Sequence, residues 1–374
     1  MKIFHKAVFL FFTMIPGFGT ANAQTGSTAG KPACEFHASY IADLVSNFSG
    51  GVKRGVTYLG LVNLKAGFDT ERGGLWKGGS AFINIGNTHG GQPSATLVGD
   101  FQGISNIEAG NLSFLYELWY KQAIGKFTLT VGLQDLNTDF AASVYGTLFS
   151  NSSFGIHSSI ADNVASPVFP LTALGANINW KVSKSYSWQA AIFDGTPDDF
   201  ETNPFNVNWK LDKNQGFLAV SEFQFRKSLV AGKTGTYKFG IYYHQHNDTI
   251  ATEQRNGGFY LVAEQEISGK ISLFSQIGLS PKKMNRNSQY YSIGCNYSGL
   301  LRGRSNDQLG IAVAFAGIHD SPAGSETAIE LGYKFIADKH TYLKPDMQYI
   351  INPAGTGTKL PNALVGFLRL GIEF

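Results

Sequence analysis

The chain has 374 residues, of which 13% are aromatic and only 15% are charged, and its formal net charge is +3. A soluble domain usually carries about 25% charged residues, so the composition argues against a protein whose whole surface faces water. A net charge this small also excludes the concentrated basic face of a nucleic-acid-binding domain. We therefore expect no nucleic-acid partner.

The amino terminus has the features of an export signal. Lys2 and Lys6 supply positive charge, residues 7–15 form a short apolar run, and the sequence Ala-Asn-Ala that ends at Ala23 is a small-x-small cleavage site. This pattern predicts a signal peptide over residues 1–23 that is removed after Ala23. The apolar run is too short to span a bilayer.

The remainder predicts a polar, flexible leader over residues 24–35 and a single domain over 36–374. No later segment approaches the roughly 18 uninterrupted apolar residues of a transmembrane helix, and no linker divides the chain. Cys34 and Cys295 could form a disulfide in an oxidising compartment. We interpret both as small apolar residues.

Apolar and polar residues alternate at period two along the whole domain. Over residues 126–134, for example, Phe127, Leu129 and Val131 alternate with small or polar residues. Such alternation is typical of a strand with different surroundings on its two faces. We expect sixteen strands, an even number as bacterial barrels require, near residues 37–47, 55–67, 78–87, 112–121, 126–134, 173–182, 186–194, 216–226, 236–245, 258–267, 270–279, 288–297, 308–317, 325–336, 341–351 and 362–374.

The final segment, residues 362–374, is the clearest of these strands. One face carries no charge and includes Leu370, whereas the other face carries Arg369 and Glu373. A strand of about eleven residues at ~3.3 Å each, tilted by ~45°, crosses a hydrocarbon layer of ~25 Å. An unpaired strand edge in lipid is costly, so we expect this strand to close a barrel against the strand near residues 38–47.

The connections between the expected strands differ at the two ends. Short turns fall near residues 122–125, 183–185, 268–269 and 337–340, whereas the opposite end has long loops over residues 88–111, 135–172 and 195–215. This asymmetry is typical of outer-membrane barrels. The sequence predicts an all-β protein, a transmembrane antiparallel β-barrel of about sixteen strands with short periplasmic turns and long outer loops, in the outer membrane of a Gram-negative bacterium.

A soluble β-sandwich is the alternative fold. A sandwich would pair the apolar face of one sheet with a second sheet, but almost every strand here has the same one-sided character. Lipid is therefore the simpler partner for the apolar faces. A homo-oligomer would use the same apolar outer wall, so the pattern leaves the oligomeric state open.

Several segments in order along the chain resemble the carbohydrate-selective outer-membrane porins of the OprB type. The resemblance spans nearly all of the expected mature chain, from about Phe36 to Phe374. It implies a sixteen-stranded porin that passes mono- and small oligosaccharides by facilitated diffusion, with no cofactor and no catalytic residue. The segments are Gly-Gly-Leu-Trp-Lys-Gly-Gly-Ser at residues 73–80, Leu-Tyr-Glu-Leu-Trp-Tyr at 115–120, Val-Gly-Leu-Gln-Asp at 131–135 with Phe140, Leu-Phe-Ser-Asn-Ser-Ser-Phe-Gly at 148–155, and Leu-Lys-Pro-Asp-Met-Gln-Tyr at 343–349 with Asn352 and Pro353.

Two other function classes remain as alternatives, an outer-membrane barrel enzyme of the lipase or protease type and a plugged structural barrel. Ser152, Ser153, His157 and Asp162 are the residue types of a nucleophilic triad, but their order and spacing match no hydrolase pattern and no Gly-x-Ser-x-Gly elbow is present. Ordinary polar loop residues explain them as well. We expect no enzymatic activity.

Two clusters contain residue types that bind metal ions. His244 and His246 stand two apart on one strand face, and Asp194, Asp198 and Asp199 surround a glycine in an outer loop. Solvated histidines at a strand end and an acidic loop explain both clusters without an ion. We expect no metal.

The loop over residues 135–172 is expected to fold into the barrel and narrow it. Loops of this length are rare unless they pack on something or carry function, and a sixteen-stranded lumen is wide enough to receive one. Sugar selectivity needs flat apolar surface for the ring and fixed polar groups for its hydroxyls. The candidate pore-lining, substrate-binding residues are Glu117, Trp119, Lys121, Glu222, Arg226, Lys344, Asp346 and Gln348, to which the resemblance adds Arg72, Phe149 and Phe154.

Overall fold

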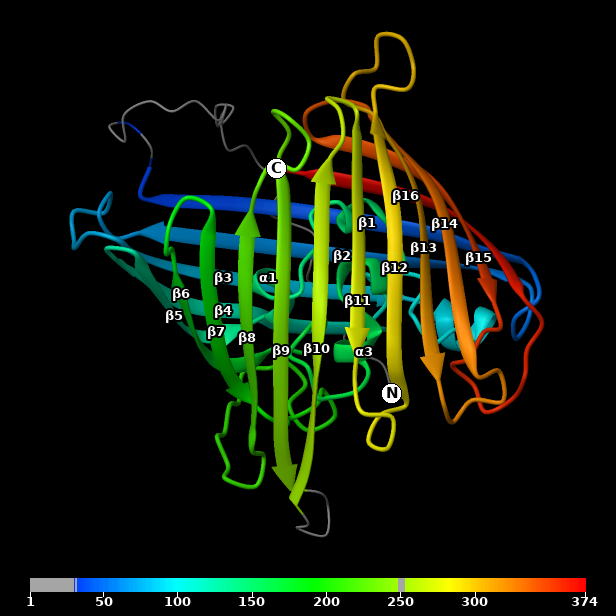
Figure 1. Ribbon diagram of the computed structural model, residues 1–374, viewed down its shortest axis with the longest axis horizontal. Helices are drawn as coiled ribbons and strands as arrows, with labels where there is room; N and C mark the ends of the chain where they lie inside the picture. Colours follow the sequence, from blue (N-terminus) through cyan, green and yellow to red (C-terminus); the bar gives the residue numbers. More distant parts are fainter. Residues whose placement is uncertain (1–29, 31, 248–252) are drawn as a thin grey trace, which may run out of the picture. The chain divides into compact units, whose positions relative to one another are not determined.

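The computed structural model describes residues 30, 32–247 and 253–374. The expected signal peptide and most of the expected leader lie outside the described residues. From Ala33 onward the chain forms one compact unit. In this part of the chain, sixteen antiparallel strands hydrogen-bond in sequence order and close into a barrel (Figure 1). The predicted fold class and strand number are therefore confirmed.

The strands follow each other along the chain with every neighbour antiparallel. They are β1 (Cys34–Ser49), β2 (Gly55–Asp69), β3 (Gly79–Gly90), β4 (Leu112–Ile124), β5 (Phe127–Gln134), β6 (Ala173–Trp180), β7 (Tyr186–Asp194), β8 (Phe217–Arg226), β9 (Gly235–Asn247), β10 (Glu253–Glu266), β11 (Ile271–Leu279), β12 (Asn287–Ser298), β13 (Gln308–Ile318), β14 (Ser325–Ile336), β15 (Thr341–Ile351) and β16 (Ala363–Glu373).

Five short helices occupy two of the connections. They are η1 (Ser94–Val98), α1 (Leu136–Asp139), η2 (Gly146–Leu148), α2 (Ser152–Gly155) and α3 (Ser158–Ala161). Among the described residues, no helix is long and apolar enough to cross a membrane. Cys34 and Cys295 are free cysteines.

The barrel closes where the sequence predicts, between the first strand and the last. Residues 39–49 of β1 pair with residues 364–373 of β16, and Asp43 lies opposite Arg369. Closure leaves no strand edge of the sheet unpaired. In the hydrocarbon region of a bilayer no water can pair with a free backbone N–H or C=O group, and each unpaired group would cost several kcal/mol.

The two faces of the strands differ as the alternation predicts. In β16, Val365 is fully buried and Phe367 is 5% exposed, whereas Leu368 on the other face is 43% exposed. Ile311 in β13 and Leu331 in β14 are also about half exposed. The outward face of these strands is thus apolar and exposed, whereas the inward face carries buried residues, some apolar like Val365 and Phe367 and some charged like Arg369.

Several strands extend further than predicted, and the largest single extension is at the start of β10. β10 begins at Glu253 rather than near residue 258, and its first residues continue the ladder with β9 up to the pair of Glu253 and Asn247. This extension consists of Glu253, Gln254, Arg255 and Asn256. Because both faces of the extension are polar, it lacks the period-two signal on which the prediction depended.

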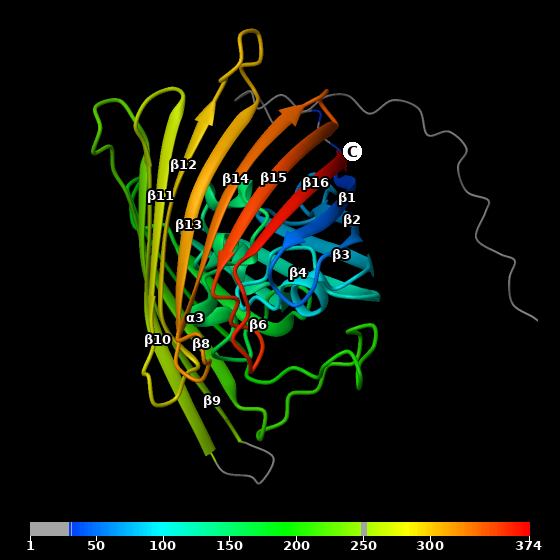
Figure 2. The same cartoon turned by 90° about the vertical axis from the view of Figure 1, so that its right-hand side faces the viewer.

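The two ends of the barrel have the predicted asymmetry. At one end, here the turn end, the connections are short, such as residues 125–126, 181–185 and 337–340. At the opposite end, here the loop end, the longest connections cover residues 91–111, 135–172 and 195–216. We refer to residues 135–172 as the inward loop because its helices α1 and α3 lie within the ring of strands (Figure 1 and Figure 2).

An arginine on the outer face of β16 should destabilise the barrel. Leu370 lies on the same face as the exposed Leu368, and an arginine at the bilayer midplane costs about 2–4 kcal/mol. We expect Leu370→Arg to lower the denaturant midpoint of unfolding in lipid vesicles. The matched variant Leu211→Arg, at a residue 73% exposed in the connection between β7 and β8, should leave the midpoint unchanged. Equal midpoints for both variants would contradict the outward orientation of Leu370.

Candidate functional site

The inward loop fills part of the lumen and shares an apolar core with the barrel wall. Leu136, Phe140 and Ile160 of the loop are fully buried, in one cluster with Phe193 of β7 and Leu218 of β8. Loop and wall therefore exclude water from each other along this side. The arrangement agrees with the inward fold expected from the length of the loop.

Carboxylates on the inner wall accept hydrogen bonds from backbone amides of the inward loop. Ser150 N donates to Glu330 Oε1 at 2.6 Å, and Asn151 N donates to Glu330 Oε2 at 2.9 Å. Ala141 N donates to Glu222 Oε2 at 2.8 Å. Both glutamates are fully buried. A buried acceptor or amide left without its partner is costly, so each glutamate side chain fixes the loop backbone beside it.

The same arrangement recurs on two further strands. Glu264 of β10 accepts from Ser143 Oγ and from Tyr145 N, both at 2.9 Å. Glu326 of β14 accepts from Phe101 N at 2.7 Å and from Gln102 N at 2.9 Å, and these two residues belong to the connection between β3 and β4. Wall carboxylates on β8, β10 and β14 thus hold two of the three long connections.

Donors on β15 bind loop carbonyls. Lys344 Nζ donates to Leu148 O at 2.8 Å, and Gln348 Nε2 donates to Ile104 O at 2.8 Å. Lys344 also pairs with Asp346 at 3.0 Å. These charges are all buried. Side chains of the wall therefore supply acceptors for N–H groups of the loop backbone and donors for its carbonyl groups.

An ion pair at the barrel closure joins this network. Arg369 donates to both oxygens of Asp43, at 2.6 and 2.7 Å. Ser105 Oγ donates to Asp43 Oδ2 at 2.7 Å, and Arg369 also donates to Asn106 Oδ1 at 2.8 Å. The seam between the first and last strands is thus tied to the connection between β3 and β4.

Six of the predicted pore-lining residues are buried against the loops. Phe149 and Phe154 lie with ring centroids 4.9 Å apart in a cluster with Phe274 of the wall. Because loop and wall cover these side chains, they have no open space beside them in which a solute could touch them. The six are Glu222, Lys344, Asp346, Gln348, Phe149 and Phe154.

In the predicted group on β4, Glu117 is buried, whereas Trp119 and Lys121 remain partly exposed. Trp119 stacks on Phe82 of β3 with ring centroids 4.9 Å apart and planes inclined by 24°. Lys121 Nζ lies 4.6 Å from the centroid of the Trp119 ring, and Trp119 Nε1 donates to Glu117 Oε1 at 3.3 Å. The structure thus brings together an aromatic surface, a cation and a carboxylate on one face of β4, as the spacing predicted.

Arg72 lies away from this group. It belongs to the turn between β2 and β3, where it pairs with Glu35 at 3.1 Å and with Asp69 at 3.6 Å. The turn is at the turn end of the barrel. Arg72 therefore stabilises this turn. Neither of its two carboxylate partners belongs to the inward loop.

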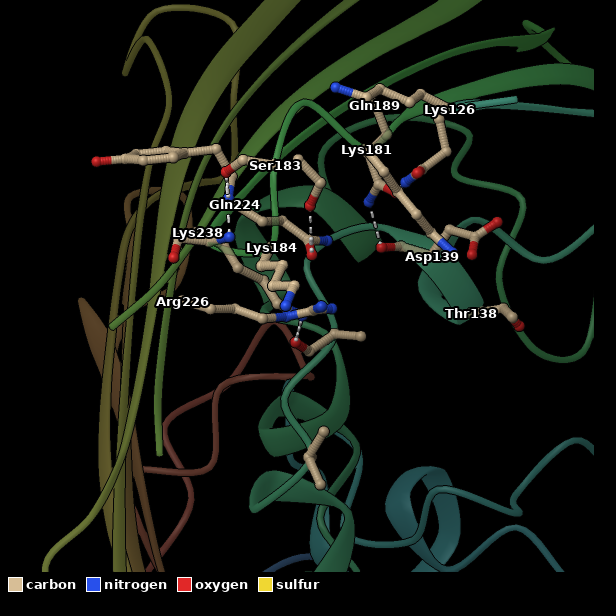
Figure 3. A pocket seen from close by; sticks show the side chains of 16 residues that line it. Lys126, Thr138, Asp139, Lys181, Ser183, Lys184, Gln189, Gln224, Arg226 and Lys238 are labelled. Atoms are coloured by element: carbon tan, nitrogen blue, oxygen red, sulfur yellow. Dashed lines mark hydrogen bonds between the residues drawn. The ribbon is translucent and has the colours of Figure 1, made fainter. Parts of the chain in front are cut away.

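A cavity of about 810 Å³ lies between the inward loop and the wall formed by β6 to β9 (Figure 3). Its lining includes Thr138, Asp139 and Ala142 of the loop. Residues of the turns at the turn end complete it, so the cavity is at that end. The cations that line the cavity are Lys126, Lys181, Lys184, Arg226 and Lys238.

Sequence reasoning identified only Arg226 of these five cations. Lys181 and Lys184 lie in the turn over residues 181–185, and Lys126 lies in the turn that precedes β5. Turn lysines carry no periodic signal, and only the fold places them beside one another. Their common position next to short turns at one end is the one feature that could have suggested the cluster.

A second cavity of about 540 Å³ lies at the loop end. It is lined by Asp100 and Glu108 among small and polar residues. Burial raises the pKa of Asp100 to about 6 and that of Glu108 to about 7. Glu108 accepts from Ser94 N at 3.1 Å. The two cavities thus differ in the sign of the charged groups that line them.

The residues of the triad alternative do not form a triad. Ser153 Oγ donates to Asn151 Oδ1 at 2.7 Å, and His157 Nδ1 is 2.8 Å from Ser159 Oγ. Burial lowers the pKa of His157 to about 3. A base for nucleophilic catalysis must reach the nucleophile and accept its proton, and this histidine bonds a different serine.

The metal alternatives are equally unsupported by the geometry. His244 and His246 stack with centroids 4.5 Å apart, and His244 Nε2 is hydrogen-bonded to a backbone carbonyl, Gly195 O, at 2.7 Å. Asp199 accepts from backbone amides of its own turn, and Asp194 does the same with Thr196. Within residues 32–247 and 253–374, no group of three metal-ligating side chains is present.

The family model of the carbohydrate-selective porins of the OprB family matches residues 53–374 of the chain. Putative porin QuiX of Acinetobacter baylyi is 22% identical, over 92% of this chain and 90% of the relative. Porin B of Pseudomonas aeruginosa is 21% identical, over 91% and 87%.

Solved structures share the fold. A structure of Pseudomonas putida OprB at high pH has a TM-score of 0.81 at 20% identity, and the match covers 91% of this chain and 94% of that one. A mutant of the Rh. blastica porin has a TM-score of 0.54 at 10% identity, over 91% and 100%. At these identities the likeness establishes the sixteen-stranded porin fold.

Loss of one wall carboxylate should release part of the inward loop. In Glu330→Ala, two buried backbone amides lose their acceptor, at about 1–3 kcal/mol each, and Lys344 loses a carboxylate 3.5 Å away. We expect higher single-channel conductance and faster protease cleavage between residues 145 and 155. Glu253→Ala, which removes a carboxylate at the loop end of β10 paired with Arg255, is the control. Wild-type conductance in both variants would contradict the anchoring role.

Proposed function

Because the chain belongs to the OprB family of carbohydrate-selective outer-membrane porins, we propose that it carries mono- and small oligosaccharides by facilitated diffusion through a lumen narrowed by the inward loop. The family consists of transport proteins, so the chain is not an enzyme. The observation that carries the proposal is the set of buried wall carboxylates that hold the loop backbone. An anchored loop sets the width of the path for every solute.

The cavity at the turn end is the space through which a sugar leaves the narrowed region. Its volume of about 810 Å³ falls within the range of about 300–1,000 Å³ typical of small-molecule sites. With the short turns at the periplasmic side, as in outer-membrane barrels, this cavity opens toward the periplasm. A sugar therefore passes the anchored loop before it reaches the cavity.

Selection of sugars requires an apolar plane and fixed hydrogen-bonding groups. The stacked pair of Trp119 and Phe82 supplies the plane for the C–H face of a pyranose ring. Lys121 supplies a donor beside the same ring, and the buried Glu117 accepts from Trp119 Nε1 and so orients the ring toward the sugar. Arg226 supplies a further donor from β8 in the cavity wall. In this proposal the aromatic pair, Lys121 and Arg226 contact the sugar.

The buried residues of the predicted set have a different role in the proposal. Glu222, Lys344 and Gln348 each bond the backbone of an inward connection, and Asp346 pairs with Lys344. They position the loops that form the path. Phe149 and Phe154 pack the loop on the wall. Substitution of these six would alter the width of the path for all solutes.

The outer wall and the termini complete the proposal. The exposed leucines, isoleucines and aromatic residues of the strands face lipid, and a homo-oligomer would cover part of the same wall. Residues 24–35 form a leader before the barrel domain over 36–374. The number of chains in the assembly is measured by size-exclusion chromatography in a detergent of known micelle mass.

The export signal predicts the mass of the mature protein. Cleavage after Ala23 places Gln24 at the amino terminus. We expect intact-protein mass spectrometry of purified outer membranes to return the mass of residues 24–374. A mass that includes Met1 would contradict the predicted cleavage.

Removal of the aromatic plane should reduce sugar preference. In Trp119→Ala the stacking surface is lost, and aromatic stacking contributes about 0.5–1.5 kcal/mol. We expect liposome swelling to show a several-fold smaller preference for glucose over an uncharged polyol of equal size. Trp180→Ala, at a tryptophan in β6 stacked on Phe127 of the outer face, is the matched control. No glucose permeation by the wild type would overturn the proposed function, and an unchanged preference in Trp119→Ala would remove Trp119 from the path.

A further inference from the structure

We propose that the cavity at the turn end selects anionic carbohydrates, namely sugar acids with a carboxylate and several hydroxyls. The inference rests on the proposed function, because it assumes that solutes cross the lumen. The substrates of the channel would then include negatively charged sugars as well as neutral ones. The cavity of about 810 Å³ is large enough for one such molecule.

The first observation is the excess of positive charge. Five cationic side chains line the cavity, whereas Asp139 is the single carboxylate among its lining residues. Five positive charges and one negative charge leave an excess of four. Asp139 Oδ2 accepts from Asn177 Nδ2 at 2.7 Å, so this carboxylate already has a neutral partner on the wall.

The second observation is that the cations lack carboxylate partners. Within the described residues, none of the five forms an ion pair within 4.0 Å. Lys126 Nζ donates to Val182 O at 3.2 Å and Lys238 Nζ donates to Ala142 O at 2.5 Å. Both partners are backbone carbonyls, which satisfy a hydrogen bond but carry no net charge to balance the ammonium.

The third observation concerns Glu222, a wall carboxylate next to the cavity. Glu222 directs Oε2 at Ala141 N and at the hydroxyl of Tyr260. Its Oε1 accepts from the amides of Gln189 and Gln224, at 3.0 and 2.7 Å. Those two glutamines line the cavity, so they stand between the carboxylate and the cavity space.

Polar neutral groups line the same cavity and suit the hydroxyls of a sugar acid. They include Asn179, Ser183, Ser185 and Ser187, beside the lysines of the same turn. Figure 3 shows Lys181 and Lys184 from this turn together with Arg226 from β8 around the cavity. Arg226 offers a planar fork that binds a carboxylate through two parallel hydrogen bonds.

A cleft lined by one sign of charge concentrates counter-ions. In low-dielectric walls this focusing raises local concentration and association rates by about 10–10³. A neutral sugar gains nothing from it, whereas a sugar acid does. The second cavity, lined by Asp100 and Glu108 at the loop end, has no cation among its lining residues, so of these two cavities only the one at the turn end has an excess of positive charge.

The test measures ion preference and sugar uptake on the same full-length protein. Reversal potentials in planar bilayers under a gradient of potassium gluconate at low ionic strength give the permeability ratio of gluconate to potassium. Liposome swelling gives glucose uptake independently. We expect the wild type to favour gluconate over potassium. In Lys181→Gln/Lys184→Gln the ratio should fall about tenfold, the lower end of the focusing range, while glucose uptake persists.

The control removes two lysines of equal charge outside the cavity. Lys282→Gln/Lys283→Gln lies in the exposed connection between β11 and β12, at the opposite end of the barrel from the cavity. Its ratio should equal that of the wild type. The reversed variant Lys181→Glu/Lys184→Glu leaves three positive and three negative charges in the cavity, so the enrichment of gluconate should be lost.

Three results would overturn the inference: a wild type that favours potassium over gluconate, a ratio unchanged in Lys181→Gln/Lys184→Gln, or an equal fall in the control. Each leaves the proposed function intact if glucose still enters the liposomes. Channels that conduct ions but admit no glucose would overturn the proposed function instead. Folding of every variant is checked by the retained heat-modifiable mobility of the barrel on gels.

Discussion

Backbone amides of the inward loop donate to buried carboxylates of the barrel wall, and the arrangement of the lumen depends on these hydrogen bonds. Glu222, Glu264 and Glu330 each receive at least one amide of the loop. A buried charge without partners is strongly unfavourable, and a buried amide without an acceptor is also costly. The loop supplies amide donors for the buried carboxylates, and the wall supplies acceptors for the buried amides. If the loop moved away from the wall, these carboxylates and amides would lose their hydrogen-bond partners.

This constraint explains how charge is distributed along the lumen. The wall carboxylates beside the loop face its amides, and Lys344 and Arg369 pair with Asp346 and Asp43. Five cations without a carboxylate partner line the cavity near the short turns, beside the first part of the inward loop. A wall that is nearly balanced in overall charge thus presents a local excess of one sign to a solute.

The strand architecture could be predicted from the sequence because a single physical boundary acts on every strand. An apolar exterior and a polar or tightly packed interior impose period two, as in the alternation of Leu368, Arg369 and Leu370. The extension of β10 from Glu253 was missed because both of its faces are polar. Periodicity reports a difference between two environments, and it is silent where the environments are alike.

The site was predicted less completely, for a related reason. Alternation placed Trp119 and Lys121 on the lumen face of one strand, and they do lie together. It also placed Glu222 and Gln348 there, but only the folded loop decides that these side chains bond a backbone. Lys181 and Lys184 come from a turn with no periodic signal. Contacts between a wall and a distant loop do not appear in any local pattern.

Hydrogen–deuterium exchange on the unmodified protein tests the anchored loop most directly. Amides that donate to buried acceptors exchange only when the local structure opens, on a scale of minutes to hours. The account predicts strand-like protection for the amides of Ala141, Tyr145, Ser150 and Asn151. The exposed segment around Lys210 and Leu211 should exchange at the fastest time point. Exchange of the four loop amides as fast as that segment would contradict a loop held by the wall carboxylates.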